Sequence, residues 1–241
     1  MDHLDGELLY KLFSTCLSVE YDTVEDGASF AVFGERGTGG ASGKNGKDKL
    51  YIFFEKSNGA EDWANNLDFY ASEGYEARKR PDLYAPAVAA YKDMSEAWYC
   101  HSGFMRVWKS IIPYVEEIIS DKKFDSATVV GYSHGAALAL LCHEYIWFNR
   151  PDMRGRIFGY GFGCPRVIYG HVGRAKERWR DFYVIRNIDD LVTHLPPRIL
   201  GYRHVGKLVS MGKVGKYSSI DAHREQNYLT ELDAIRSEGD V

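Results

Sequence analysis

The sequence has no long hydrophobic run and no secretory leader pattern in its first residues. No apolar stretch approaches the roughly 18 residues that a membrane-spanning helix needs. Met1-Asp2-His3-Leu4-Asp5-Gly6-Glu7 is acidic and lacks the basic region and the cleavage site of a signal peptide. We therefore expect no transmembrane segment and a cytoplasmic location.

The sequence also has few cysteines and no excess of basic residues. Its four cysteines, at positions 16, 100, 142 and 164, form no C-x-x-C pair, so free buried thiols are expected. The net charge is −4, and acidic and basic residues are interspersed, which argues against a nucleic-acid partner.

Signals for metals and cofactors are lacking as well. The histidines show no metal-ligand spacing. The glycine-rich stretch 34–49 contains Gly43-Lys44 but fails as a phosphate-binding loop, because Thr38 stands where the first glycine is needed and Asn45 where Ser or Thr should bind magnesium. We expect a flexible hairpin connection there, and no cofactor or metal.

Apolar patterning predicts strands and helices in alternation over much of the chain. Helical spacing predicts an opening helix around 8–17, a long helix over Ser102–Ser120 and a closing helix around 228–235, and 87–98 is helix-like. Strands are expected at 29–33, 50–54, 157–162 and 182–185, with a strand ladder near 201–211. This order predicts an α/β fold, with a mostly parallel central sheet flanked by helices, in a single domain over residues 1–241.

The chain is organised around Gly131-Tyr132-Ser133-His134-Gly135, between a β-branched run and a long apolar run of helix formers. A nucleophile elbow needs a strand, a turn that only small residues fit on either side of the serine, and a helix. Both flanks are present, so we interpret Ser133 as a nucleophile rather than a serine in an ordinary strand–helix turn.

A serine nucleophile needs a base, and the base needs a carboxylate to orient it. Asp189 and Asp190 both follow the predicted strand 182–185, where the acid of such a sheet is expected, whereas Asp181 precedes it. Among later histidines, loop–helix geometry favours His223 over His204, which lies in an apparent strand.

A series of short motifs runs in order from about residue 50 to about residue 232. They are Phe54-Glu55-Lys56-Ser57 with Asp62-Trp63, His101-Ser102-Gly103-Phe104, Gly131 to Ala139, Phe162-Gly163-Cys164-Pro165-Arg166-Val167, Asp190 to Pro197, Gly201 to Gly206, and Asp221-Ala222-His223 with Tyr228. In this order they resemble the motifs of the class 3 (fungal-type) lipases, which are α/β-hydrolases.

The resemblance implies Ser133 as nucleophile, Asp190 as acid and His223 as base, with His204 in a structural strand. It also implies an oxyanion hole formed by the backbone N–H of His134 and by Ser57. Departures from the family pattern include Tyr132 in place of the usual histidine, Glu55-Lys56 in place of Arg-Gly, and Thr193 in place of a proline. No departure removes a catalytic group.

These residues predict a serine carboxylic-ester hydrolase, a lipase acting on acylglycerols through an acyl-enzyme. A phospholipase A1 or a small-ester esterase could use the same triad, and a non-catalytic binding protein would not need all three residues. The expected partners are a lipid or small ester and, transiently, a lipid surface. The resemblance places a lid helix at 59–70, carrying Trp63 and Leu67, and a fixed core helix is the alternative.

Overall fold

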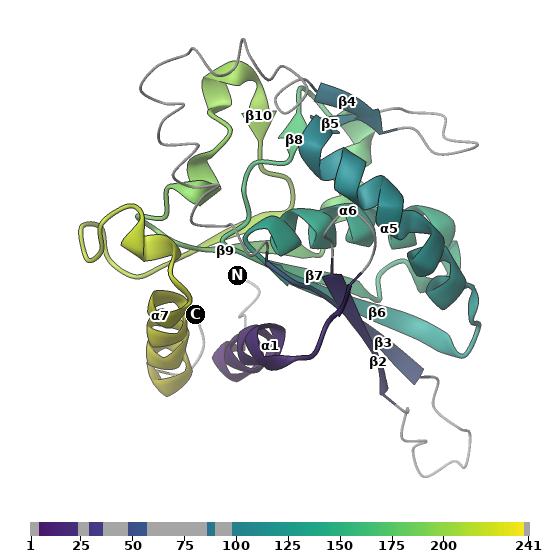
Figure 1. Ribbon diagram of the computed structural model, residues 1–241, viewed down its shortest axis with the longest axis horizontal. Helices are drawn as coiled ribbons and strands as arrows, with labels where there is room; N and C mark the ends of the chain where they lie inside the picture. The colour runs from purple at the N-terminus through teal and green to yellow at the C-terminus, as the bar shows by residue number, and fades with distance from the viewer. Residues whose placement is uncertain (1–4, 24–28, 36–47, 57–85, 90–97, 239–241) are drawn as a thin grey trace.

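The computed structural model describes residues 5–23, 29–35, 48–56, 86–89 and 98–238 of the 241-residue chain. Within these residues a seven-stranded sheet forms the centre of the molecule (Figure 1). Its strands, in spatial order, are β1 (Asp22–Thr23), β2 (Ser29–Glu35), β3 (Asp48–Phe54), β6 (Phe124–Tyr132), β7 (Ile157–Phe162), β9 (Phe182–Asn187) and β11 (Lys207–Met211).

The larger part of this sheet is parallel. Strands β3, β6, β7, β9 and β11 run in one direction, whereas β1 and β2 are antiparallel to their neighbours. The register aligns Tyr132 at the end of β6 with Phe162 at the end of β7. Parallel strands bring their carboxyl ends to one edge, which is where sites form in such sheets. The predicted mostly parallel sheet is confirmed.

Helices cover both faces of the sheet, because neighbouring strand residues point to opposite sides. Phe54 and Val129 pack in the cluster under α5 (Ser102–Ser120) and α6 (His134–Asn149). Phe53 and Val130 pack in the cluster on the other face, with α1 (Gly6–Ser18) and α7 (Glu225–Glu238) (Figure 1). The opening, long and closing helices expected from apolar spacing are therefore present.

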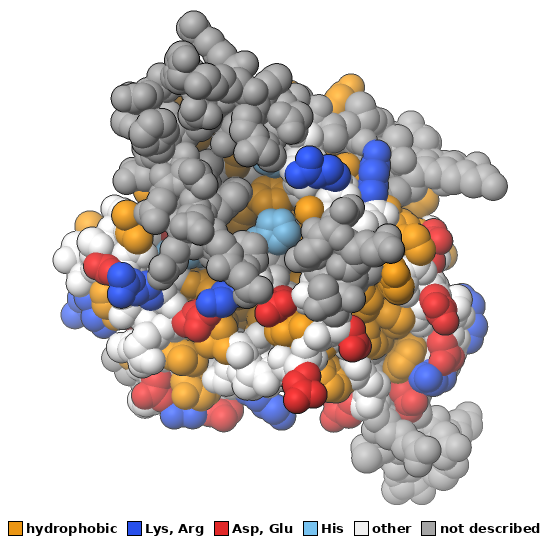
Figure 2. Space-filling model, in the orientation of Figure 1, with side chains coloured by type: hydrophobic (Ala, Val, Ile, Leu, Met, Phe, Trp, Pro, Cys, Tyr) orange, Lys and Arg blue, Asp and Glu red, His pale blue; other side chains and the backbone are white. Residues whose placement is uncertain are grey.

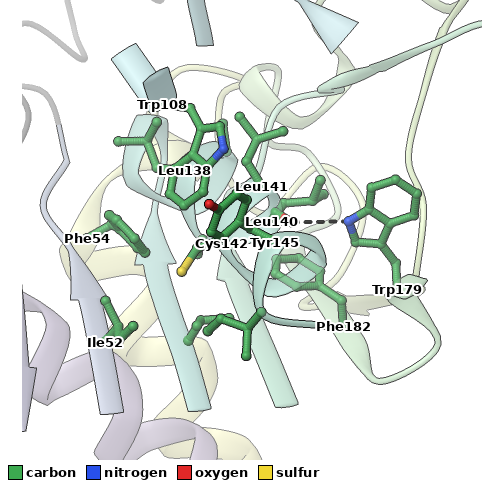
Figure 3. Close-up of a cluster of buried hydrophobic side chains, with 14 of the residues drawn as sticks. Ile52, Phe54, Trp108, Leu138, Leu140, Leu141, Cys142, Tyr145, Trp179 and Phe182 are labelled. Atoms are coloured by element: carbon green, nitrogen blue, oxygen red, sulfur yellow. Dashed lines mark hydrogen bonds between the residues drawn. The ribbon is translucent and has the colours of Figure 1, made fainter. Parts of the chain in front are cut away.

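Helix α6 lies in the middle of the larger cluster and is buried on all sides from Gly135 to Ile146. Trp108 of α5 packs against Tyr145 with ring centroids 5.7 Å apart. The indole of Trp179, in the short helix η3 (Gly173–Trp179), donates to the Leu140 carbonyl at 3.0 Å (Figure 3). Burying a side chain of this size stabilises the fold by ~1.5–3 kcal/mol. This packing holds the middle and the C-terminal half of α6 against α5 and η3.

A second, four-stranded antiparallel sheet corrects two expectations. It contains β4 (Pro86–Ala89), β5 (Trp98–His101), β8 (Ile168–Tyr169) and β10 (Tyr202–Arg203). The helix expected at 87–98 is wrong at both ends, since β4 pairs with β5, and residues 90–97 lie outside the described part. The expected ladder near 201–211 is instead two strands in different sheets, because Gly206 turns the chain from β10 toward β11.

The remaining short helices lie in the connections. They are η2 (Pro151–Met153), η4 (Val192–His194), η5 (Arg198–Leu200) and η6 (Asp221–His223). Cys16, Cys100, Cys142 and Cys164 are buried and unbridged, as predicted. None of the helices that the structure describes is long and apolar enough to cross a bilayer. The organisation of residues 1–241 as a single domain stays a prediction.

Candidate active site

Ser133 lies in the sharp turn between β6 and α6. Its φ is 56° and its ψ is −119°, which makes it the non-glycine residue with positive φ among those described. A Cβ at Gly131 would lie 2.2 Å from the Gly135 carbonyl oxygen, and one at Gly135 would lie 2.3 Å from that of Phe54. The two glycines are therefore required by backbone contact, and strain at a nucleophile is typical of functional sites.

Two residues from distant parts of the chain meet Ser133. The Nε2 atom of His223, in η6, lies 2.8 Å from Ser133 Oγ, and its Nδ1 atom lies 2.8 Å from Asp190 Oδ2. Asp190 is fully buried and His223 is 8% exposed, so the imidazole connects a buried carboxylate with the edge of the site. The structure thus brings together the three residues that the sequence singled out.

Asp190 accepts further hydrogen bonds that hold its carboxylate still. The backbone N–H of Val192 donates to Oδ1 at 2.9 Å, and the hydroxyl of Tyr228, in α7, donates to Oδ2 at 2.6 Å. Burial and then the Asp190 charge raise the pKa of Tyr228, so this hydroxyl remains a donor. With His223, these donors orient Asp190 on both oxygens.

Two other side chains hold the segment that carries His223. The Tyr132 hydroxyl donates to the His223 carbonyl, and the two rings stack with centroids 5.2 Å apart. The Asn187 amide, at the end of β9, donates to the Ala222 carbonyl at 2.8 Å. Sequence reasoning gave Tyr132, Asn187 and Tyr228 no role. The signal for Tyr132 was its departure from the family's usual histidine.

The alternative acid and base lie elsewhere. Asp189 Oδ2 accepts from the Gly215 backbone at 2.8 Å. His204 directly follows the strand β10 instead of lying within it, and its Nε2 contacts the Thr193 carbonyl at 2.8 Å. Burial lowers the pKa of His204 to about 4. His204 therefore supports the loop that follows Asp190 and does not contact Ser133.

The backbone N–H of His134 lies at the first position of α6. The first amides of a helix have no partner within the helix, and its N-terminal end favours negative charge. Burial lowers the pKa of the His134 imidazole to about 4, and burial and His134 lower the pKa of nearby His101 to about 4. Both rings are therefore neutral near pH 7.

Other predicted site residues lie outside the described part of the chain. Ser57, the second oxyanion candidate, and the lid candidates Trp63 and Leu67 are among them. Within the described residues, no group of three or more His, Cys, Asp or Glu is arranged to hold a metal ion. On the face drawn in Figure 2, a histidine bordered by hydrophobic side chains reaches the surface, and acidic and basic side chains are intermixed around it.

The sequence profile of the lipase (class 3) family matches residues 51–200, which include Ser133 and Asp190. The secreted mono- and diacylglycerol lipase LIP2 of Malassezia restricta is 28% identical over 175 residues, covering 65% of this chain and 51% of the relative. Secreted mono- and diacylglycerol lipase 1 of Fusarium solani is 26% identical over 166 residues, covering 66% of this chain and 43% of the relative.

A solved structure shares the fold. The mono- and diacylglycerol lipase of Aspergillus oryzae superposes with a TM-score of 0.56 at 14% identity, covering 91% of this chain and 83% of that one. The predicted α/β-hydrolase fold is confirmed. The chain spans about half the length of the curated relatives it matches.

The predicted cytoplasmic location is contradicted by these relatives. Several of them, from Malassezia and Fusarium, are named secreted lipases. The prediction rested on the charge pattern of seven residues, whereas the similarity to secreted lipases extends over 65% of the chain.

Proposed function

We propose that this chain, which belongs to the class 3 lipase family, is a serine hydrolase that cleaves the ester bonds of acylglycerols. The observation that carries the proposal is the imidazole of His223, 2.8 Å from the Ser133 hydroxyl on one side and 2.8 Å from the Asp190 carboxylate on the other. This arrangement suits acyl transfer, because a serine hydroxyl attacks only when a base takes its proton.

In the first step, Ser133 Oγ attacks the ester carbonyl carbon and its proton passes to His223 Nε2. The hydrogen bond to Asp190 fixes the proton of the neutral ring on Nδ1, so that Nε2 carries the lone pair. The imidazolium that forms is stabilised by the Asp190 carboxylate, which stays ionised.

The negative charge that develops on the carbonyl oxygen needs donors. The N–H of His134 at the start of α6 supplies one, and we assign the second to Ser57 by family resemblance. Removal of one such donor typically costs ~3–4 kcal/mol of transition-state stabilisation. Because the His134 ring is neutral, it adds no positive charge to stabilise the oxyanion, and the backbone N–H is the donor at this residue.

The intermediate then collapses. The bond to the glycerol oxygen breaks, the leaving alkoxide takes the proton from His223 Nε2, and the acyl group stays on Ser133. Water repeats the sequence, giving its proton to Nε2 while its oxygen bonds to the acyl carbon. Cleavage of the Ser133 ester returns the proton to Oγ and releases a fatty acid.

The names of the relatives favour mono- and diacylglycerols as substrates and an extracellular place of action. Such esters collect at lipid–water surfaces, so the enzyme would contact a lipid surface transiently. The intermixed surface charges give no reason to expect a nucleic-acid partner.

The proposal is tested with nitrophenyl esters of increasing acyl length, with and without a serine-directed phosphonate. We expect hydrolysis that the phosphonate abolishes, and a mass increase on the peptide that contains Ser133. A folded protein without turnover on any ester, or labelling at another serine, would contradict it. Comparing mono-, di- and triacylglycerols with phosphatidylcholine then separates an acylglycerol lipase from a phospholipase A1.

A further inference from the structure

The short helix η5 presents adjoining hydrophobic side chains to solvent beside the candidate active site. Ile199 is 92% exposed and Leu200 is 51% exposed. Pro197 precedes them, and Gly201, with a φ of 91°, ends the helix after one turn. This turn therefore exposes the hydrocarbon of two adjoining side chains to water.

The helix η5 is joined to the site from two directions. It follows directly on the loop of Asp190, and Tyr202 just after it packs on His101 with ring centroids 5.8 Å apart. His101 packs on Phe104 at 4.8 Å, and Phe104 on His134 at 5.6 Å. Three successive ring contacts therefore connect the end of η5 with His134, the residue that follows the nucleophile.

Positive charge gathers behind this tip. Arg198 belongs to η5 itself, Arg166 donates to the carbonyls of His194 and Pro196, and Arg186 Nη1 lies 3.1 Å from His194 Nε2. None of the three lies within 4.0 Å of a carboxylate of the described chain, although the whole chain is acidic with a net charge of −4. Burial lowers the pKa of Arg166, and the charges of Arg186 and Arg198 lower it further.

We propose that Arg198, Ile199 and Leu200 form a docking surface, here called the η5 surface, for a negatively charged lipid–water interface. The apolar tip enters the lipid, and the arginines meet anionic head groups or ionised fatty acids. The inference rests on the proposed function, because it supplies the place where the enzyme meets its ester substrate. The inference adds that the enzyme prefers lipid–water interfaces that carry negative charge.

The test is sedimentation with vesicles of phosphatidylcholine alone and with phosphatidylglycerol added, using the Ser133→Ala chain so that the lipid is not consumed. We expect stronger partitioning onto the anionic vesicles, weakened by salt because surface charges are screened. Arg198→Ser should reduce binding to anionic vesicles about 5-fold, as expected for one arginine near anionic lipid. Ile199→Ser combined with Leu200→Ser should reduce it at least about 10-fold, since hydrophobic insertion is lost.

Matched controls lie on α1, which covers the other face of the sheet. Leu8→Ser, where Leu8 is 38% exposed, and Lys11→Ser remove an exposed apolar and an exposed basic side chain there. Both should leave partitioning unchanged. Equal binding to neutral and anionic vesicles, or equal loss in the α1 variants, would overturn the proposal. So would a dimer in solution that the η5 substitutions dissociate, because the surface would then bind a second copy.

Hydrolysis of a dissolved short-chain nitrophenyl ester keeps this proposal separate from the proposed function. In the background with Ser133 intact, the η5 variants should hydrolyse that ester at the parent rate while losing activity on anionic emulsions. An enzyme that binds anionic vesicles but hydrolyses no ester would refute the proposed function alone.

Discussion

Two buried polar networks meet helix α6, one at its first residue and one about 15 Å further along it. In the first, the imidazole of His223 lies between a hydroxyl and a carboxylate, and His223 remains 8% exposed. In the second, Glu144 is fully buried and accepts from Arg178 at 2.6 Å and from the Trp98 indole at 3.3 Å. The first can pass a proton between its members. The second cancels opposite charges and holds β5 and η3 on α6.

The comparison of the two networks indicates that buried charged groups serve two purposes around α6, catalysis at its start and packing further along it. A network that contains a proton carrier beside a nucleophile suits chemistry, whereas a network of matched opposite charges suits packing. Substitutions in the first should therefore change rates, and substitutions in the second should change stability.

The largest effect is expected for Ser133→Ala. Removing the attacking oxygen should lower kcat by about 10⁴-fold or more. The melting temperature should stay close to that of the parent, because little volume is lost. Ester hydrolysis and thermal unfolding measured on the same preparation test this, and retained turnover in a folded protein would refute the role of Ser133.

For the carboxylate we expect Asp190→Asn to lower kcat by about 10⁴-fold, because an amide favours the wrong imidazole tautomer. The matched control is Asp189→Asn. It changes an adjacent carboxylate that accepts only from the Gly215 backbone in the described structure, so the rate should fall less than about 2-fold. Equal effects of the two substitutions would show that Asp190 has no special part in the reaction.

The two candidate histidines should separate in the same way. His223→Ala should lower kcat nearly as much as Ser133→Ala. His204→Ala removes the contact with the Thr193 carbonyl and should cost ~1–2 kcal/mol of unfolding free energy with little change in rate per folded molecule. Loss of activity in His204→Ala at an unchanged melting temperature would show that His204, and not His223, is the base.

Breaking the second network should affect stability. Arg178→Leu leaves the Glu144 carboxylate buried without this partner and should cost about 3–5 kcal/mol of unfolding free energy, measured with urea. Adding Glu144→Gln removes the charge but keeps an acceptor for Trp98, so at least half of the loss should be recovered. A large fall in kcat of the folded Arg178→Leu protein would contradict the assignment of the second network to stability alone.

The smallest effect is expected for Tyr132→Phe. It removes the hydroxyl that holds the His223 carbonyl but keeps the stacked ring, so we expect a loss of ~0.5–1.5 kcal/mol. If the lost hydrogen bond positions the His223 imidazole, kcat/KM for a short ester should drop about 2- to 12-fold. If Tyr132 serves only packing, the melting temperature should change and kcat/KM should not. Tyr160→Phe, the same change on β7 where Tyr160 stacks on Tyr183 at 5.5 Å, is the control and should leave the rate unchanged.

Local sequence patterns determined much of what could be predicted. The turn at Ser133 is marked by a pattern of five residues between a strand and a helix, and amphipathic spacing depends on neighbours one turn away, so α1, α5 and the elbow were predictable. The order of Ser133, Asp190 and a later histidine also followed from the parallel arrangement of strands.

Tertiary structure decided the rest. The residues at 87–89 and at 98 have no local feature that excludes a helix, and they form strands because β5 pairs with β4 on one side and β8 on the other. His223 reaches Ser133 across 90 positions and Asp190 across 33. Only the packing of α7 and η6 against the sheet edge determines that this imidazole, rather than that of His204, faces the serine, because such distances depend on the whole fold and not on any segment of the chain.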